Sequence, residues 1–330
     1  MITPVTPASW MSHLIVHDSS LNYIGQNGSL IRFVEVSDDV SHLALKQVLH
    51  DTHKEQNIAL FSASSHLCNL NRPDLVLHLL CQRFPLRNYL VAVCKQIWRD
   101  IGFVSDDSVL LTDAFRVLGG EPNGLLRKFV KELRDLTGRS LATTNMDEGA
   151  RFSRDFSNAL INCCTSLTDG DYSQIRVFES WLCGGPSTAA ERRTLGIMSP
   201  IKRETATANL KSLLCLISIS GWTGSILHLD IRSLTDQKSF SDIPSSNVSK
   251  TKRIGTYQWL RELIDQVQFF TGTLIVVEVA PGFVDQSPTG KGVGLYDALK
   301  NRIIDDVIVD GPANRSAVSV PLGENQIHVI

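Results

Sequence analysis

The sequence predicts an α/β fold, in which a parallel sheet is flanked by helices and carries a helical insertion. Residues 29–36, 57–62 and 274–279 form short, continuous apolar runs, which are typical of strands buried on both faces. A segment with helical periodicity separates the first two runs, and a long succession of helical patterns follows them. A strand, a helix and a strand at this spacing form a βαβ unit, whose crossover is almost always right-handed.

The first of these helices is expected within residues 40–56. Val40, Leu43, Ala44 and Val48 recur there at helical spacing, and Leu45 and Leu49 extend the apolar pattern. We expect this apolar stripe to be the face of the helix that packs on the sheet.

The region that follows is predicted to be helical almost throughout, because glycines punctuate one amphipathic pattern after another. The expected helices are 74–81, 87–100, 108–117, 123–136, 151–166 and 172–182. We therefore expect a single domain, with a core of about residues 20–72 and 205–330 and a helical insertion of about residues 73–200.

The second half of the core begins with an expected helix at 205–219. It leads to a strand at 225–230, which ends in Asp230. A polar stretch at 236–255 is too long for an ordinary connection between elements. A helix at 257–270 then leads into the last buried strand.

Composition excludes several classes of protein. The 330 residues are 43% hydrophobic and 20% charged, which excludes wholesale disorder. The net charge of −2 argues against a protein that coats nucleic acid by bulk charge. The seven cysteines form no C-x-x-C pair, which argues against a disulfide framework and a cysteine zinc site and leads us to expect a cytoplasmic protein. No apolar stretch approaches the roughly 20 residues that cross a membrane, so we expect no membrane partner.

A buried strand that ends in Asp, followed two segments later by another buried strand, is the layout of a P-loop NTPase, in which the Asp assists Mg²⁺ binding. We therefore expect a P-loop NTPase-like parallel sheet. Such a fold needs a glycine-rich loop with Lys and Ser or Thr after its first strand. Here the first strand is followed by residues 37–42 (SDDVSH), with no Gly and no Lys. Asp38 and Asp39 instead cap the expected helix and place negative charge where a triphosphate would sit.

The other catalytic positions of such a fold are altered as well. Ile231 and Arg232 follow Asp230, so no carboxylate stands directly after it to activate water. The last buried strand, at 274–279, ends with Glu278 and Val279 followed by Ala280, so no Ser, Thr or Asn stands at its tip to contact a γ-phosphate.

Six short segments, in this order along the chain, carry a resemblance to a known family. They are residues 181–186 (WLCGGP), 195–202 (LGIMSPIK), 221–230 (GWTGSILHLD), 256–265 (TYQWLRELID), 276–283 (VVEVAPGF) and 295–302 (LYDALKNR). The series resembles the ATP-binding proteins of BREX-type phage-defence systems, which carry W-L-x-G-E, L-G-I-x-x-x-I, Walker B, A-Y-x-x-L-R-x-L-I-D, sensor and Y-x-A-L-x-x-R-L elements in the same order. The resemblance implies an ATPase of the AAA+/RecA-like kind.

The departures from the family pattern bear on catalysis. The glycine-rich Walker A loop is missing, Ile231 stands at the Walker B glutamate, and Ala280 stands at the sensor threonine. Asp230 is what remains of a degenerate Walker B motif. We therefore expect a pseudo-ATPase that has kept the scaffold, with no catalytic residues, no cofactor and no metal.

Two single residues allow a functional and a structural interpretation. Asp230 is either a metal ligand or a hydrogen-bonded Asp at the end of a strand. Arg302 is either an arginine that completes a neighbour's ATP site in trans, since that role needs only a correctly placed guanidinium, or a salt-bridged surface residue.

Two groups of residues remain open in the same way. One side of the expected helix, away from the apolar stripe, carries His42, Lys46, His50 and His53. These residues either hold a metal, contact a phosphate or a nucleic acid, or form a solvated face. The long polar loop carries Lys250, Lys252 and Arg253, which either contact a DNA backbone or are solvated.

The sequence thus predicts a non-catalytic subunit, a scaffold or regulator in a prokaryotic antiviral defence complex. Its expected partners are an active ATPase, a nuclease or a helicase, and an oligomer is possible. The alternative hypothesis is a DNA-binding module that recruits the complex through the basic loop 250–253.

Overall fold

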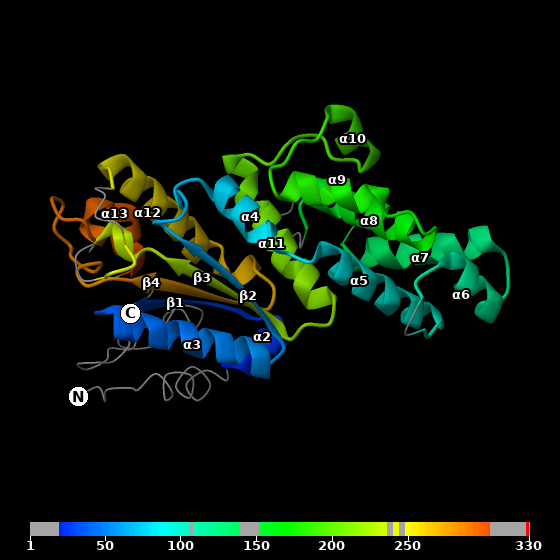
Figure 1. Ribbon diagram of the computed structural model, residues 1–330, viewed down its shortest axis with the longest axis horizontal. Coiled ribbons are helices and arrows are strands. Elements are labelled where there is room, and N and C mark those ends of the chain that lie inside the picture. The colour runs from blue at the N-terminus through cyan, green and yellow to red at the C-terminus, as the bar shows by residue number, and fades with distance from the viewer. Residues whose placement is uncertain are drawn as a thin grey trace. The chain divides into compact units, whose positions relative to one another are not determined.

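The computed structural model describes residues 20–105, 108–138, 152–235, 240–243, 248–303 and 328–329 (Figure 1). The chain divides into two compact units. Unit 1 combines residues 1–76 with residues 222–330, and unit 2 contains residues 77–221.

Unit 1 is built on a sheet in the strand order β2-β3-β4-β1-β5. The first four strands in this order run parallel to their neighbours, and β5 pairs antiparallel with β1. The strands are β1 (Ser29–Glu35), β2 (Ile58–Ser64), β3 (Gly224–Asp230), β4 (Thr273–Val279) and β5 (His328–Val329). The prediction of an α/β fold with a parallel sheet flanked by helices is confirmed.

The helices of unit 1 cover both faces of this sheet. α3 connects β1 to β2 on one face, and α12 connects β3 to β4 on the other (Figure 1). Open α/β sheets bind their ligands at the carboxyl ends of the strands. The elements are α2 (Ser20–Gly25), α3 (Asp39–Glu55), η1 (Arg232–Leu234), α12 (Lys250–Asp265), η2 (Val267–Phe269), η3 (Val293–Leu295) and α13 (Asp297–Arg302).

The start of α3 is fixed by a reciprocal cap. The Asp38 carboxylate accepts a hydrogen bond from the Ser41 backbone N–H at 2.8 Å, and the Ser41 hydroxyl accepts one from the Asp38 N–H at 3.2 Å. The hydrogen bonds to Ser41 lower the pKa of Asp38. Asp39 accepts the backbone N–H of Ser241 instead, at 3.1 Å. The expectation that the two aspartates occupy the helix N-terminus is confirmed.

The predicted buried stripe of α3 is correct in part. Leu45 and Leu49 are buried and Val48 packs against the core cluster, whereas Val40 and Leu43 are 76% and 63% exposed. The helix is rotated because His42, which the sequence placed on the solvated side, is buried among polar partners. Its pairing fixes which side of α3 faces the sheet.

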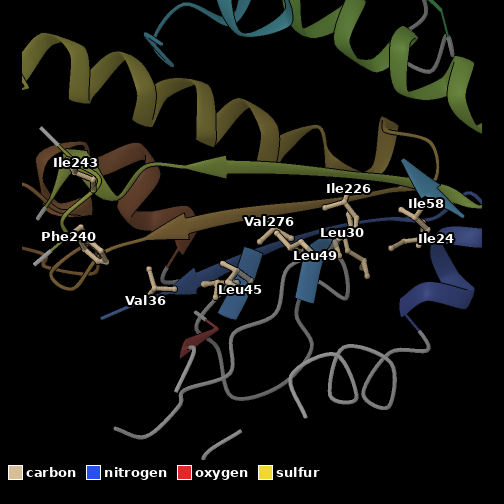
Figure 2. Packing of buried hydrophobic residues seen from close by; sticks show 13 residues of the cluster. Ile24, Leu30, Val36, Leu45, Leu49, Ile58, Ile226, Phe240, Ile243 and Val276 are labelled. Atoms are coloured by element: carbon tan, nitrogen blue, oxygen red, sulfur yellow. The ribbon is translucent and has the colours of Figure 1, made fainter. Parts of the chain in front are cut away.

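One core cluster of unit 1 lies between α3 and the sheet (Figure 2). Alternate residues of each strand face α3, so β3 and β4 both contribute apolar side chains first and polar ones toward their carboxyl ends. The cluster consists of Ile24, Leu30, Val34, Val36, Leu45, Leu49, Ile58, Ile226, Phe240, Ile243, Leu274, Val276 and Ala280.

Unit 2 is helical in all the parts that the structure describes. α4 (Pro73–Cys81) spans the boundary between the units. The helices that follow are α5 (Leu86–Ile101), α6 (Leu111–Leu118), α7 (Pro122–Leu136), α8 (Arg154–Thr168), α9 (Ser173–Leu182), α10 (Ala189–Thr194) and α11 (Arg203–Ile219). Aromatic pairs hold the bundle together, among them Trp98 with Phe129 and Phe156 with Phe178. Among the described helices, none is long and apolar enough to span a membrane.

The cap gives a first test. We expect Asp38→Ala to lower the free energy of unfolding by about 1 kcal/mol, because it removes an N-cap carboxylate. Asp51→Ala, which changes an exposed Asp on the same helix, serves as the control. Urea denaturation at pH 7 measures both, and equal losses in the two variants would contradict the assignment of the cap.

Candidate functional site

Two buried carboxylates lie side by side at the carboxyl ends of the central strands. Asp230 is the last residue of β3, and the strand register pairs it with Glu278 of β4. Their side chains are 2% and 0% exposed. Like charges directly opposite each other across two strands destabilise a sheet, and burial adds to the cost. The pair therefore requires a positive partner.

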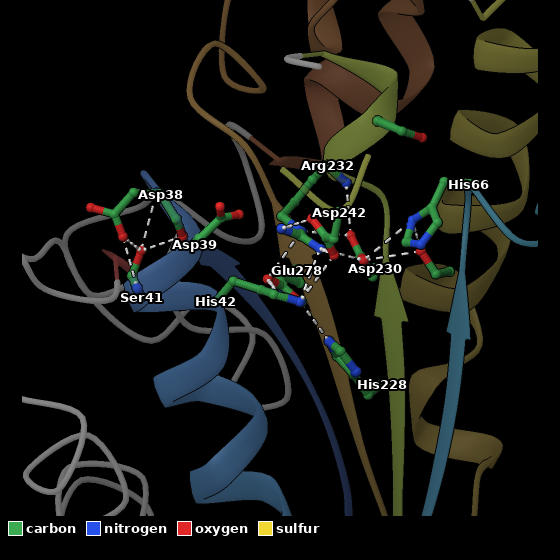
Figure 3. A network of polar contacts seen from close by, with 12 residues as sticks. Asp38, Asp39, Ser41, His42, His66, His228, Asp230, Arg232, Asp242 and Glu278 are labelled. Atoms are coloured by element: carbon green, nitrogen blue, oxygen red, sulfur yellow. Dashed lines mark hydrogen bonds and ion pairs between the residues drawn. The ribbon is translucent and has the colours of Figure 1, made fainter. Parts of the chain in front are cut away.

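The guanidinium of Arg232 supplies that positive charge (Figure 3). Its Nε and Nη2 donate to the two oxygens of Asp230 at 3.0 and 2.9 Å, the two-pronged geometry that arginine forms with carboxylates. The same Nε lies 3.2 Å from Oε1 of Glu278. The Arg232 side chain is fully buried, and its guanidinium carbon lies 4.5 Å from the centre of the Phe240 ring.

Two histidines complete the environment of Glu278. His42 contacts its Oε1 through Nδ1 at 2.5 Å, and His228 contacts its Oε2 through Nε2 at 2.9 Å. Nη2 of Arg232 lies 3.1 Å from Nε2 of His42, and an arginine can only donate. The hydrogen-bond network therefore assigns His42 an acceptor at Nε2 and a proton at Nδ1, which it donates to Glu278.

A loop segment closes the site from the outside. Asp242, whose side chain is 35% exposed, accepts from Arg232 Nη2 at 2.8 Å. The neighbouring Ser241 donates its backbone N–H to Asp39 at the start of α3, and Phe240 and Ile243 are buried in the core cluster. Residues 240–243 thus lie over the carboxyl ends of the strands and fasten to α3.

The pKa shifts follow from these contacts. Burial raises the pKa of Asp230, but the Arg232 hydrogen bonds and charge outweigh it and bring the value to about 2. Burial also raises the pKa of Glu278, but the hydrogen bond from His228 outweighs it, so the pKa is lowered. In Asp242 the hydrogen bond from Arg232 outweighs burial in the same way. Burial alone would lower the pKa of Arg232, yet the bonds to Asp230 raise it. All three carboxylates are therefore ionised at neutral pH.

The site also has the ligand atoms of a metal centre. One atom each from His42, Asp230 and Glu278 lie within 4.8 Å of one another. These are nitrogen and oxygen ligands that suit a divalent cation. The Arg232 guanidinium already bonds to all three residues, so the positive charge in this cluster is internal to the chain.

The residues that the sequence predicted for a site lie in different parts of the structure. Asp230 lies in the site, whereas Lys250, Lys252 and Arg253 do not. The assignment of these three to a loop is wrong, because they form the first turn of α12, whose N-cap is Ser249. Arg253 donates to the Leu234 carbonyl at 2.8 Å, while Lys250 and Lys252 are exposed.

The remaining predicted positions lie outside the polar cluster. Arg302 on α13 is 46% exposed and pairs with Asp265 at 2.7 Å. Lys46 and His50 are exposed, and His53 stacks on Trp222 with a 6.2 Å ring separation. Of the four residues on that predicted helix side, the structure brings only His42 into the site.

Sequence reasoning missed the roles of Arg232, Glu278, His228 and Asp242. Strand alternation could have shown that His228 and Asp230 share a face. The parallel register was also inferable in outline, and it sets Glu278 beside Asp230. Nothing local marks Asp242, which is held from a connecting loop.

The family comparison agrees with the resemblance seen in the sequence. Residues 126–326, more than half of the chain, match the family described as BREX system ATP-binding protein BrxC/D. No curated protein and no solved structure is significantly similar to the chain. The chain belongs to this BREX ATP-binding family, which places it among the subunits of a defence system and implies further subunits as partners.

The central ion cluster gives a second test. We expect Arg232→Met to lower the free energy of unfolding by about 3–5 kcal/mol at pH 7, because it leaves buried carboxylates without their cation. The additional change Asp230→Asn should recover part of the loss, since it removes one of the stranded charges. Urea denaturation of the single and double variants measures both effects.

The free energy of unfolding should depend on pH with opposite signs in the wild type and in Arg232→Met. In the wild type the lowered carboxylate pKa values contribute stability above about pH 4, which is lost as the pH falls toward 2. Without Arg232, buried carboxylates take up protons more readily in the folded state, so the deficit should shrink between pH 7 and pH 5. A deficit that is constant over this range would contradict the proposed role of the guanidinium.

Proposed function

We propose that this chain is a catalytically inactive, ATPase-like subunit that serves as a scaffold or regulator in a prokaryotic antiviral defence complex. The observation that carries the proposal is the two-pronged ion pair of Arg232 with Asp230. In a P-loop NTPase the corresponding Asp assists Mg²⁺ binding. Here the oxygens of that carboxylate are taken by a side chain of the chain itself.

Both carboxylate oxygens of Asp230 accept hydrogen bonds from donors of the chain itself. Besides the Arg232 guanidinium, Asp230 accepts from the Arg232 backbone N–H at 3.1 Å and from the Ser64 hydroxyl at 3.0 Å. A hydrated Mg²⁺ demands near-octahedral oxygen ligands and could approach only by displacing these donors. The residues present do not fit a Mg²⁺–nucleotide complex at this point.

The N-terminus of α3, where the phosphates of a nucleotide would bind in a P-loop NTPase, supports the same proposal. A phosphate-binding helix N-terminus needs free backbone N–H groups and a glycine-rich approach. At α3 the Ser41 N–H is occupied by Asp38, and Asp39 accepts from Ser241. Two carboxylates thus stand where phosphate oxygens would have to lie, and like charges repel.

The altered catalytic positions support inactivity as well. Ile231 is buried and carries no carboxylate for water activation, and Ala280 is a fully buried member of the apolar core. What is preserved is a well-packed sheet with its helices on both faces. We infer that this scaffold acts by binding other subunits, such as an active ATPase, a nuclease or a helicase.

Arg302 fits a trans role only in part. The Arg302 side chain is half exposed and therefore accessible to a neighbouring subunit. Its guanidinium, however, forms an ion pair with Asp265 at the end of α12. An arginine that completes a neighbour's site would have to exchange this partner for a phosphate.

Calorimetry tests the proposal most simply. With purified protein and MgATP we expect no binding heat and no ATP turnover above background, because Arg232 occupies the Asp230 carboxylate and two carboxylates stand at the N-terminus of α3. A known active P-loop ATPase is the positive control. Turnover that disappears in Asp230→Ala would contradict the proposal.

A second candidate function is recruitment through DNA contact at residues 250–253. The observation in its favour is that Lys250 and Lys252 are exposed on α12 and that the first turn of this helix has no acidic residue. Positive side chains at the positive end of a helix dipole add to a local potential that suits phosphate.

A further inference from the structure

Helix α7 of unit 2 carries a row of cations on one side. Arg127, Lys131 and Arg134 follow one another at i, i+4 and i+7, and Lys128 borders the row. All four side chains are exposed. Within the part of the chain that the structure describes, no hydrogen bond or ion pair neutralises any of them. Of the acidic residues of the helix, Asp135 follows Lys131 by four residues and borders the row on the Lys128 side, and Glu132 lies further round the helix, so the four cations outnumber the two carboxylates.

The opposite side of α7 fixes the direction in which this row points. Leu125, Phe129 and Leu133 are buried at i, i+4 and i+8. The ring of Phe129 lies 4.7 Å from that of Trp98 in α5. Because this apolar stripe is anchored in the bundle, α7 cannot rotate to hide its cations, and the row faces outward.

The connection before α7 has the features of a helix–turn–helix. α6 ends at Leu118 and α7 begins at Pro122, so only three residues join them. Gly119 and Gly120 adopt positive φ angles of 67° and 89°, which favour glycine and turn the chain sharply. In DNA-binding proteins with such a turn, the second helix enters the major groove.

We propose that α7 binds duplex DNA, with Arg127, Lys131 and Arg134 contacting its phosphates. The row spans about 10 Å along the helix, and duplex DNA presents a negative charge about every 1.7 Å along its axis. Each cation therefore meets a phosphate without a special sequence. The inference does not depend on whether unit 1 hydrolyses ATP, and it concerns a surface in a different unit from Lys250 and Lys252.

Fluorescence anisotropy with the full chain and a labelled 20-base-pair duplex of random sequence tests the proposal. We expect binding at low salt, with an affinity that falls steeply as salt is added. The variant R127Q/K131Q/R134Q should bind at least 10-fold more weakly, and its salt slope should drop by about 2–3, roughly one per lost phosphate contact. Thermal unfolding verifies that the variant is folded.

The matched control is R83Q/R176Q/R193Q, which removes the same charge from exposed positions elsewhere in unit 2. It should bind DNA like the wild type. Equal loss in both triple variants, or loss only in K250Q/K252Q, would overturn the proposal. The proposal would also be overturned if the wild type did not bind DNA but bound a poly-glutamate peptide through α7, since that result would indicate an acidic protein partner.

Discussion

The structure of unit 1 depends on one electrostatic constraint, the juxtaposition of Asp230 and Glu278 in adjacent parallel strands. The strand register forces the two buried carboxylates together, and only a cation between them makes the arrangement stable. Arg232 meets this requirement from two residues beyond the strand end. Its position in turn determines where His42 and Asp242 lie, and hence how α3 and residues 240–243 pack.

This constraint bears on the proposal that the chain is an inactive, ATPase-like subunit. In a nucleotide-binding relative, a negative strand end is neutralised by a metal ion that arrives with the substrate. In this chain the Arg232 guanidinium supplies the positive charge at that point. A site neutralised from within is suited to a structural subunit, because its shape does not change with nucleotide supply.

The sequence was sufficient for the four parallel strands and the location of Asp230, because continuous apolar runs identify parallel strands regardless of their partners. It was insufficient for the orientation of α3, since the apolar pattern placed Val40 and Leu43, rather than His42, on the side that faces the sheet. The partners that bury His42 lie 190 and 236 residues away, beyond any local pattern. The same limit explains the misplaced start of α12, where a polar, cationic run was interpreted as a loop although Ser249 caps a helix.

The central claim is that Arg232 takes the place of a metal ion, and manganese binding followed by electron paramagnetic resonance tests it most directly. The wild type should leave added Mn²⁺ free in solution. Arg232→Ala should bind one Mn²⁺ through His42, Asp230 and Glu278, whose ligand atoms already lie within 4.8 Å of one another. A wild type that binds Mn²⁺ at this cluster, or a folded Arg232→Ala variant that does not, would contradict the account.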